Sequence, residues 1–338
     1  MRKFFIAAIT TAMLTATAAI AQIPQNYYSS LKGKKGAELK TAVHNIIKNA
    51  TVLKYGSGSG RTWEGFYTTD RLDDGQVVDR YSNDKRYFGN KGQAVSGMNI
   101  EHSFPKSWWG GSENQAYKDL YNLMPSEQKI NSAKSNYPMG KVNNASTDNG
   151  CTKVGTGSNG YKLWEPADKW KGDFARGYMY MATAYQDFTW SGTQALQILQ
   201  QGDYPTLREW AYTLYIEWAK TDDVDQTEVE RNNEVYKIQG NRNPFVDFPN
   251  LMEYIWGDSI DYAFDPENTV TTSDYTDNPD VPTEETIYQA TFTSETGSFT
   301  AKNISEPYSG FEVWTRDTKY GWKGTGYANN RAYAQKQR

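Results

Sequence analysis

Residues 99–109, with the sequence NIEHSFPKSWW, hold the most concentrated set of reactive side chains in the chain, and the interpretation of the fold starts from them. The run DLYNLMP follows at residues 119–125. Glu101 and His102 are adjacent, and adjacent residues of a β-strand point to opposite faces of its sheet. Both side chains can therefore reach one substrate group only if the strand is distorted or if a metal ion lies at its edge. A hairpin that leads into a helix would place Asn131 across from them.

These side chains match the needs of phosphodiester hydrolysis. An enzyme must deprotonate the attacking water and neutralise negative charge on the phosphorane and on the leaving 3′ oxygen. His102 suits the proton transfer because an unperturbed histidine has a pKa of about 6.5. Glu101 and Asn131 offer oxygen ligands of the kind that Mg²⁺ accepts while it keeps several waters. The other histidine, His44, lies in a predicted helix at 36–49, where a structural role is favoured.

The composition excludes several other kinds of site. One Cys in 338 residues rules out a disulfide-stapled fold and thiolate-based metal centres, and two His exclude a multi-histidine centre. The net charge of −4 gives no overall signal for a polyanion. Between Arg80 and Arg176, however, 14 Lys or Arg stand against 9 Asp or Glu, with Trp and Tyr interleaved. This local excess favours nucleic acid at one face, with an ordinary solvated surface as the alternative.

The N-terminus predicts export. Met1–Lys3 is a short positive region, residues 4–18 are apolar, and Ala19–Ala21 has the small-x-small pattern of a cleavage site. We therefore expect a signal peptide at 1–21 and a mature chain from Gln22. A membrane-spanning helix is the alternative, but it needs roughly 20 strongly apolar residues and this stretch contains several Thr. We expect a mature protein that has no membrane span and is secreted, periplasmic or attached to the cell surface.

The mature chain divides into a mixed domain and a smaller β-rich part. The mixed domain is predicted to span residues 22–265. Helices are predicted within it at 36–49, after a capping box at Thr206–Glu209, at 227–239 and at 249–256. Gly240 is expected to end the helix at 227–239. Residues 54–97 are expected to form strands and loops. A polar, Pro- and Thr-containing linker is predicted at 266–285. Residues 286–338 are expected to form a β-rich module that is too short to close a sandwich, so we expect a fragment.

Several short motifs resemble one bacterial family. IEHSFP at 100–105, DLYNL at 119–123, and Asn131 followed by Ser135-Asn136 are similar to the active-site region of bacterial endonuclease I. This family consists of extracellular or periplasmic non-specific nucleases of the His-Me finger (ββα-metal) superfamily. Stretches at 164–176 and 238–245 also match, so the resemblance extends over roughly residues 55–256.

The resemblance implies an α+β fold with a ββα-metal core and surrounding helices. By the family pattern, His102 is the general base and Asn122 supports the site by hydrogen bonding. Glu101 and Asn131 bind one Mg²⁺, with Mn²⁺ or Ca²⁺ as alternatives because oxygen ligands discriminate poorly between these ions. The implied activity is that of an exported monomeric endonuclease. It hydrolyses DNA and RNA without strong sequence specificity and leaves 5′-phosphate and 3′-hydroxyl ends.

The chain departs from the family pattern at two positions. Tyr121 stands where the family commonly has His, and Lys134 stands where it commonly has Arg. Lys keeps the charge but lacks the bidentate phosphate contact of a guanidinium. We predict substrate contacts from Lys134, Arg176 and Arg242, with pairing to buried acids as the alternative for the two arginines.

Other features favour structural interpretations. Glu165 and Asp168 are candidate extra metal ligands, but their segment equally reads as the approach to a helix. The glycine-rich stretch at 56–60 lacks the Gly-Lys-Ser/Thr ending of a phosphate-binding loop, which favours a surface loop.

Two other functions remain open at this point. One is a secreted nucleic-acid-binding protein with a degenerate nuclease site. The other is an adhesion or glycan-binding protein that acts through the C-terminal module, where residues 320–327 weakly resemble strand-turn segments of exported β-sandwich modules.

Overall fold

The computed structural model describes residues 23–272 and four strand segments at 288–289, 300–301, 311–316 and 319–324. The residues up to 272 belong to one compact unit and the four later segments to a second, and each unit is described by itself. The predicted signal peptide and most of the predicted linker lie outside the described residues.

The first unit combines helices with two small antiparallel sheets, which confirms the predicted α+β class. Its strands are β1 (Met98–His102), β2 (Leu123–Glu127), β3 (Asn144–Asp148), β4 (Thr152–Thr156) and β5 (Lys162–Pro166). Its α-helices are α1 (Gly36–Ile47), α2 (Thr62–Thr69), α3 (Gln115–Lys118), α4 (Gln128–Lys134), α5 (Lys171–Ala184), α6 (Ala195–Ile198), α7 (Glu209–Thr221), α8 (Gln226–Gln239), α9 (Pro244–Asp247) and α10 (Leu251–Ile255). Short 3₁₀ helices lie at η1 (Ser29–Leu31), η2 (Lys106–Trp109) and η3 (Asp168–Trp170).

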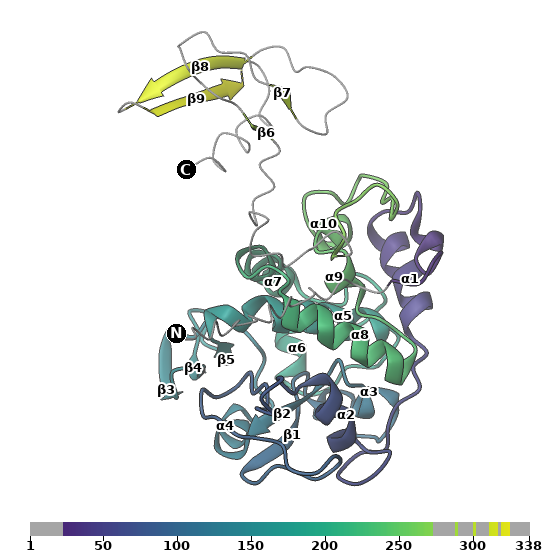
Figure 1. Ribbon diagram of the computed structural model, residues 1–338, viewed down its shortest axis with the longest axis vertical. Helices are drawn as coiled ribbons and strands as arrows, with labels where there is room; N and C mark the ends of the chain where they lie inside the picture. The colour runs from purple at the N-terminus through teal and green to yellow at the C-terminus, as the bar shows by residue number, and fades with distance from the viewer. Residues whose placement is uncertain (1–22, 273–287, 290–299, 302–310, 317–318, 325–338) are drawn as a thin grey trace, which may run out of the picture. The chain divides into compact units, whose positions relative to one another are not determined.

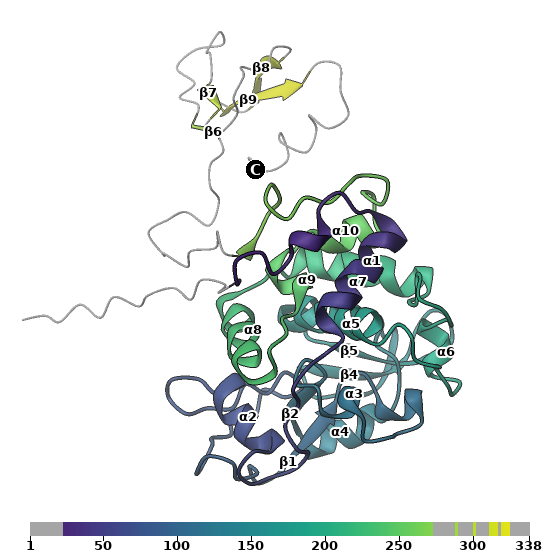
Figure 2. The ribbon, with the colours of Figure 1, turned by 90° about the vertical axis from the view of Figure 1, so that its right-hand side faces the viewer.

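Helix α5 lies at the centre of this unit (Figures 1 and 2). Twelve of its 14 residues are buried, and it contacts α1, α7 and α9. A helix that is covered on every side needs apolar residues around its whole circumference. Phe174, Tyr178, Met179 and Met181 supply them. This helix is therefore the scaffold against which the smaller elements are placed.

Strands β1 and β2 carry the stretch that opened the sequence analysis. They are antiparallel, with a regular register from Met98 opposite Glu127 to His102 opposite Leu123. Their connection contains η2 and α3. Helix α4 begins at Gln128, directly after β2, and contacts both strands (Figure 2). The expected order of strand, strand and helix is thus present, and it places Asn131 on the helix that covers β1.

A second sheet has the order β3-β4-β5 and is antiparallel throughout. A single bridge between Met139 and Trp164 joins β5 to the segment that follows α4. In the part of the chain that the structure describes, no helix is long and apolar enough to cross a membrane.

Two predictions about helices were wrong. The capping box predicted at Thr206–Glu209 does not form, because α7 begins at Glu209 and the residue before it makes no side-chain cap. Thr206 instead has a φ of 65°, and its hydroxyl donates to the carbonyl of Gly202 at 3.0 Å. The region 54–97 also contains helix α2, whereas only strands and loops were expected there.

The first unit extends beyond the predicted boundary at residue 265. Thr272 is fully buried, and Asn250 Nδ2 donates to Thr269 Oγ1 at 2.8 Å. In the second unit, β6 (Tyr288–Gln289) pairs with β7 (Thr300–Ala301), and β8 (Phe311–Arg316) pairs with β9 (Lys319–Gly324). These strands lie within the predicted β-rich module, whose truncation stays a prediction.

Candidate active site

Glu101 and His102 end strand β1, and their side chains make contacts with different elements. Glu101 Oε1 accepts a 2.7 Å hydrogen bond from Lys134 Nζ on α4, whereas the ring of His102 contacts Tyr117 on α3. The register with β2 runs unbroken through both residues, so the strand is undistorted. Among the described strands, β1 pairs with β2 alone. Its other edge is therefore the place where the two side chains can meet one group.

The surroundings of His102 select one neutral tautomer. Its Nε2 lies 2.9 Å from the carbonyl oxygen of Tyr117. A carbonyl can only accept a hydrogen bond, so Nε2 carries the proton and Nδ1 keeps its lone pair. Within the described residues, Nδ1 has no hydrogen-bond partner. The atom is also not fully buried. The imidazole is thus oriented to receive a proton at Nδ1.

Two tyrosines enclose this imidazole. The Tyr55 ring is stacked on it, with centroids 5.6 Å apart and planes 21° apart, and the Tyr117 ring meets it edge-on at 4.5 Å. His102 is only 6% exposed. Desolvation disfavours the charged imidazolium and lowers the pKa of His102 to about 3, against an ordinary value of 6.5. The ring is therefore a neutral acceptor throughout the neutral pH range.

Lys134 is an internal partner of Glu101. Its side chain is 0% exposed, and Nζ also donates to the Ser103 carbonyl at 3.1 Å and lies 5.1 Å from the centroid of the Trp164 ring. Burial raises the pKa of the Glu101 carboxyl, and the charge of Lys134 acts in the opposite direction. The predicted substrate contact from Lys134 does not fit this placement, because a fully buried ammonium cannot meet a phosphate without moving.

Asn131 lies three residues before Lys134 on α4, and residues at this spacing share one face of a helix. It is half-buried, and its side-chain amide has no hydrogen-bond partner among the described residues. Lys134 binds one oxygen of Glu101, which leaves the second carboxylate oxygen and the Asn131 amide oxygen for another ligand. One carboxylate and one amide suit a hard divalent cation that keeps several waters. In the described residues, no group of three or more His, Cys, Asp or Glu side chains is placed to hold a metal.

Asn122 holds the chain that leaves β1. Its Oδ1 accepts from the Phe104 backbone N–H at 2.7 Å, and its Nδ2 donates to the Phe104 carbonyl at 3.0 Å. The Asn122 carbonyl also accepts from the Ser103 N–H at 3.0 Å. These three bonds attach the residues after His102 to the start of β2. Asn122 therefore positions the end of β1 through hydrogen bonds to the backbone of Ser103 and Phe104.

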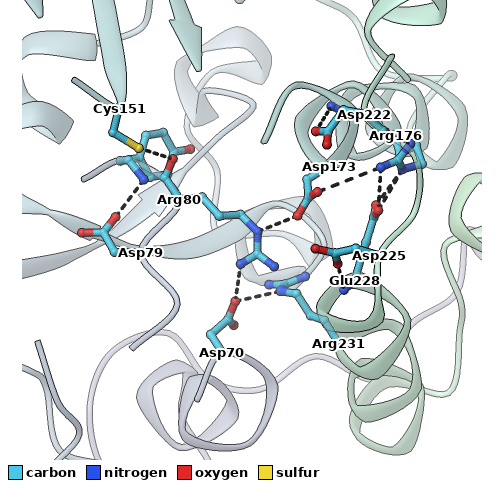
Figure 3. Close-up of polar contacts among 12 residues, drawn as sticks. Asp70, Asp79, Arg80, Cys151, Asp173, Arg176, Asp222, Asp225, Glu228 and Arg231 are labelled. Carbon is cyan, nitrogen blue, oxygen red and sulfur yellow. Dashed lines mark hydrogen bonds and ion pairs between the residues drawn. The ribbon is translucent and has the colours of Figure 1, made fainter. Parts of the chain in front are cut away.

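The predicted substrate role of Arg176 conflicts with its surroundings. Its guanidinium is buried and bidentate to Glu228, with Nε to Oε1 at 2.8 Å and Nη2 to Oε2 at 2.7 Å. Figure 3 shows that this pair belongs to an internal network that also includes Arg80 and Asp173. The alternative interpretation, pairing with a buried acid, describes Arg176 correctly.

Arg242 is placed in the same way, and its predicted substrate role fails for the same reason. It is 0% exposed, and Nε and Nη2 bind Asp247 at 2.7 and 2.8 Å. Tyr28 OH also donates to Asp247, at 2.6 Å. The arginine thus neutralises a buried carboxylate and stabilises the fold.

The DLYNL motif is largely structural. Asp119 is fully buried and accepts hydrogen bonds from the hydroxyls of Tyr180 and Tyr185, each at 2.7 Å. The hydroxyl of Tyr121 donates to Asn232 Oδ1 at 2.6 Å, so this departure from the family pattern faces the interior. Glu165 and Asp168, considered as extra ligands, both pair with Lys171.

Three residues near His102 were missed by the sequence analysis: Tyr55, Lys106 and Tyr117. Tyr55 directly precedes the glycine-rich stretch at 56–60, and Arg61 Nη1 donates to its carbonyl at 2.8 Å. Lys106 is four residues after His102 in the stretch 99–109, and this closeness in sequence was the only signal that it could lie near the site. Tyr117 acts through its carbonyl, which no sequence pattern reveals.

Strand β1 thus ends in Glu101 and His102, β2 follows it along the chain, and α4 contacts both strands. The sequence model of the Endonuclease I family matches residues 35–250, and the chain belongs to this family.

Curated relatives agree with this assignment. The chain is 32% identical over 254 residues to the extracellular ribonuclease of Bacillus subtilis (strain 168), a match that covers 72% of this chain and 82% of the relative. It is 31% identical over 242 residues to the extracellular ribonuclease of Bacillus amyloliquefaciens, with coverage of 69% and 78%. The periplasmic deoxyribonuclease of Aeromonas hydrophila is 25% identical over 134 residues, with coverage of 40% and 49%.

Proposed function

We propose that this protein is an exported, divalent-metal-dependent endonuclease of the ββα-metal type. It hydrolyses phosphodiester bonds of DNA and RNA without strong sequence specificity and leaves 5′-phosphate and 3′-hydroxyl ends. The observation that carries the proposal is the neutral His102, which follows Glu101 at the end of β1 and whose Nδ1 has no hydrogen-bond partner among the described residues. The names of the relatives support both substrates, since they include ribonucleases and deoxyribonucleases. Their extracellular and periplasmic names also support export and the predicted signal peptide.

In this mechanism His102 acts as the general base. Its Nδ1 accepts a proton from the attacking water, and the Tyr117 carbonyl keeps Nε2 protonated and the ring in place. The stacked Tyr55 excludes water from one face of the ring. Asn122 keeps the end of β1 in position while the proton moves.

Glu101 and Asn131 are the residues that would hold the divalent cation. When bound, the cation supplies positive charge for the phosphorane and for the leaving 3′ oxygen. Burial raises the pKa of Glu101, the charge of Lys134 acts against that rise, and the 2.7 Å hydrogen bond from Lys134 fixes the direction of the carboxylate. Mg²⁺ is our first choice for the ion.

The test is degradation of supercoiled plasmid and of RNA by the purified protein, with Mg²⁺ and with chelator. We expect nicking that the chelator abolishes and that Mg²⁺ restores, and products that a ligase accepts because they carry 5′-phosphates. His102→Ala should remove the activity and leave the thermal transition largely unchanged. Full activity of this variant would refute the role of the base. Binding without cleavage by the wild-type protein would favour a nucleic-acid-binding protein with a degenerate site.

A further inference from the structure

Lys106 is an exposed cation beside the candidate active site. It is the first residue of η2, and its Nζ donates to Tyr117 OH at 3.1 Å. The ammonium also lies over the Tyr117 ring, 4.9 Å from the centroid. No carboxylate of the described residues lies within ion-pair distance of it. Its charge is therefore held in place and is not neutralised by the protein.

Tyr117 connects this lysine to His102. The backbone carbonyl of Tyr117 accepts from His102 Nε2 at 2.9 Å, and its ring meets the imidazole at 4.5 Å. One residue thus orients the base through its main chain and the ammonium through its hydroxyl. Burial is the main cause of the lowered pKa of His102 and of the raised pKa of Glu101, and the charge of Lys106 acts to lower both, which agrees with a position near both groups.

The three cations that were predicted to contact substrate are all engaged in internal ion pairs. Lys134 binds Glu101, Arg176 binds Glu228, and Arg242 binds Asp247, and all three cations are buried. A nuclease that binds nucleic acid needs accessible positive charge near the reacting phosphate, since phosphate contacts supply most of the sequence-independent affinity.

We propose that Lys106, positioned by the Tyr117 hydroxyl, binds a non-bridging oxygen of the nucleic-acid phosphate that enters beside His102. This inference rests on the proposed function and names a substrate-binding residue for it. An ammonium has three donors, and the Tyr117 hydroxyl uses one, so two remain for phosphate oxygens. The hydroxyl and the ring restrict the flexible side chain before the substrate arrives, which reduces the entropy lost on binding.

The first test measures binding without cleavage. Lys106→Gln is made in the His102→Ala background, and its affinity for a fluorescent DNA duplex is followed by anisotropy over a range of salt concentrations. We expect affinity to fall by about tenfold at about 0.1 M salt. The slope of log affinity against log salt should become shallower by about 0.9, the value for the loss of one phosphate contact.

Lys35→Gln in the same background is the matched control. Lys35 is also exposed, and within residues 23–272 its Nζ makes a single hydrogen bond, to the carbonyl of Asp261 at 3.3 Å. It immediately precedes α1, whose start lies at the other end of the first unit from β1 (Figures 1 and 2). This variant should keep the affinity and the salt slope of its parent. Equal losses in the two lysine variants would overturn the inference, because they would indicate a general effect of charge.

Tyr117→Phe tests the positioning role. It keeps the ring and the carbonyl that orients His102 and removes only the hydroxyl that holds Lys106. In the otherwise wild-type enzyme we expect KM to rise by about three- to tenfold with little change in kcat, in its pH dependence or in Tm. An unchanged KM would show that the hydroxyl does not position Lys106, and a fall in kcat alone would assign Tyr117 to the base instead.

The two proposals fail in different ways. If the wild-type protein does not cleave plasmid with Mg²⁺, the proposed function is wrong. If it cleaves but Lys106→Gln binds DNA as tightly and with the same salt slope as Lys35→Gln, the function stands and the inference about Lys106 is wrong.

Discussion

The protonation of His102 offers the sharpest test of the site. Burial between Tyr55 and Tyr117 lowers its pKa from 6.5 to about 3, which corresponds to a preference for the neutral ring on the order of 5 kcal/mol. In the metal-free protein at about pH 5, about one His102 ring in a hundred should be protonated, whereas an ordinary histidine would be almost fully charged.

The same shift predicts how stability depends on pH. The folded pKa is lowered, so the unfolded chain binds the proton more readily and the free energy of unfolding falls as the pH falls from 6.5 towards about 3. At about pH 5 the contribution of His102 should be reduced by about 2 kcal/mol relative to about pH 8. Urea unfolding of the wild type and of His102→Gln at both pH values isolates this amount, because other titrating groups act in both proteins.

Nuclear magnetic resonance gives the direct assay. The chain contains two histidines, so the ring Cε1–Hε1 spectrum has two signals, and His102→Gln assigns them by the loss of one. The His102 signal should not move between about pH 8 and about pH 5 in chelator-treated protein, and ring ¹⁵N shifts should place the proton on Nε2. A titration midpoint near 6.5, or a proton on Nδ1, would refute both the desolvation of the ring and its assignment as a preorganised base.

The remaining predictions separate chemical roles from structural ones. Asn131→Ala should lower cleavage by at least about tenfold and raise the Mg²⁺ concentration needed for activity. The unfolding free energy should change by no more than about 0.5 kcal/mol, because the amide has no partner among the described residues. A large loss of stability would contradict this prediction. Asn122→Ala should cost about 2–3 kcal/mol in urea unfolding as well as activity, since it deletes two hydrogen bonds to Phe104. Arg242→Met should cost about 3–5 kcal/mol by leaving Asp247 buried without its cation, yet the folded fraction should bind DNA normally in the anisotropy assay. Weakened binding at full stability would restore Arg242 to the substrate site.

Local sequence signals predicted the features that depend on neighbouring residues. Helix α8 ends where Gly240 takes a positive φ of 77°, as a glycine after an amphipathic segment predicts. The capping box at Thr206–Glu209 failed because the Thr206 hydroxyl binds the carbonyl of Gly202 and the buried Lys40, at 3.0 Å each. Lys40 lies far away in the sequence, so no local window contains this competing contact.

The candidate site divides in the same way. The sequence alone determined which chemical groups are present and that Glu101 and His102 are adjacent. The family resemblance implied that a helix carrying Asn131 would follow the second strand. Only the tertiary structure decided that Arg176 and Arg242 are internal ion pairs, that Lys134 is a partner of Glu101, and that Lys106 remains exposed. The reason is physical. The charge state and availability of a side chain depend on its desolvation and its partners, and folding supplies these from segments that are distant in the chain.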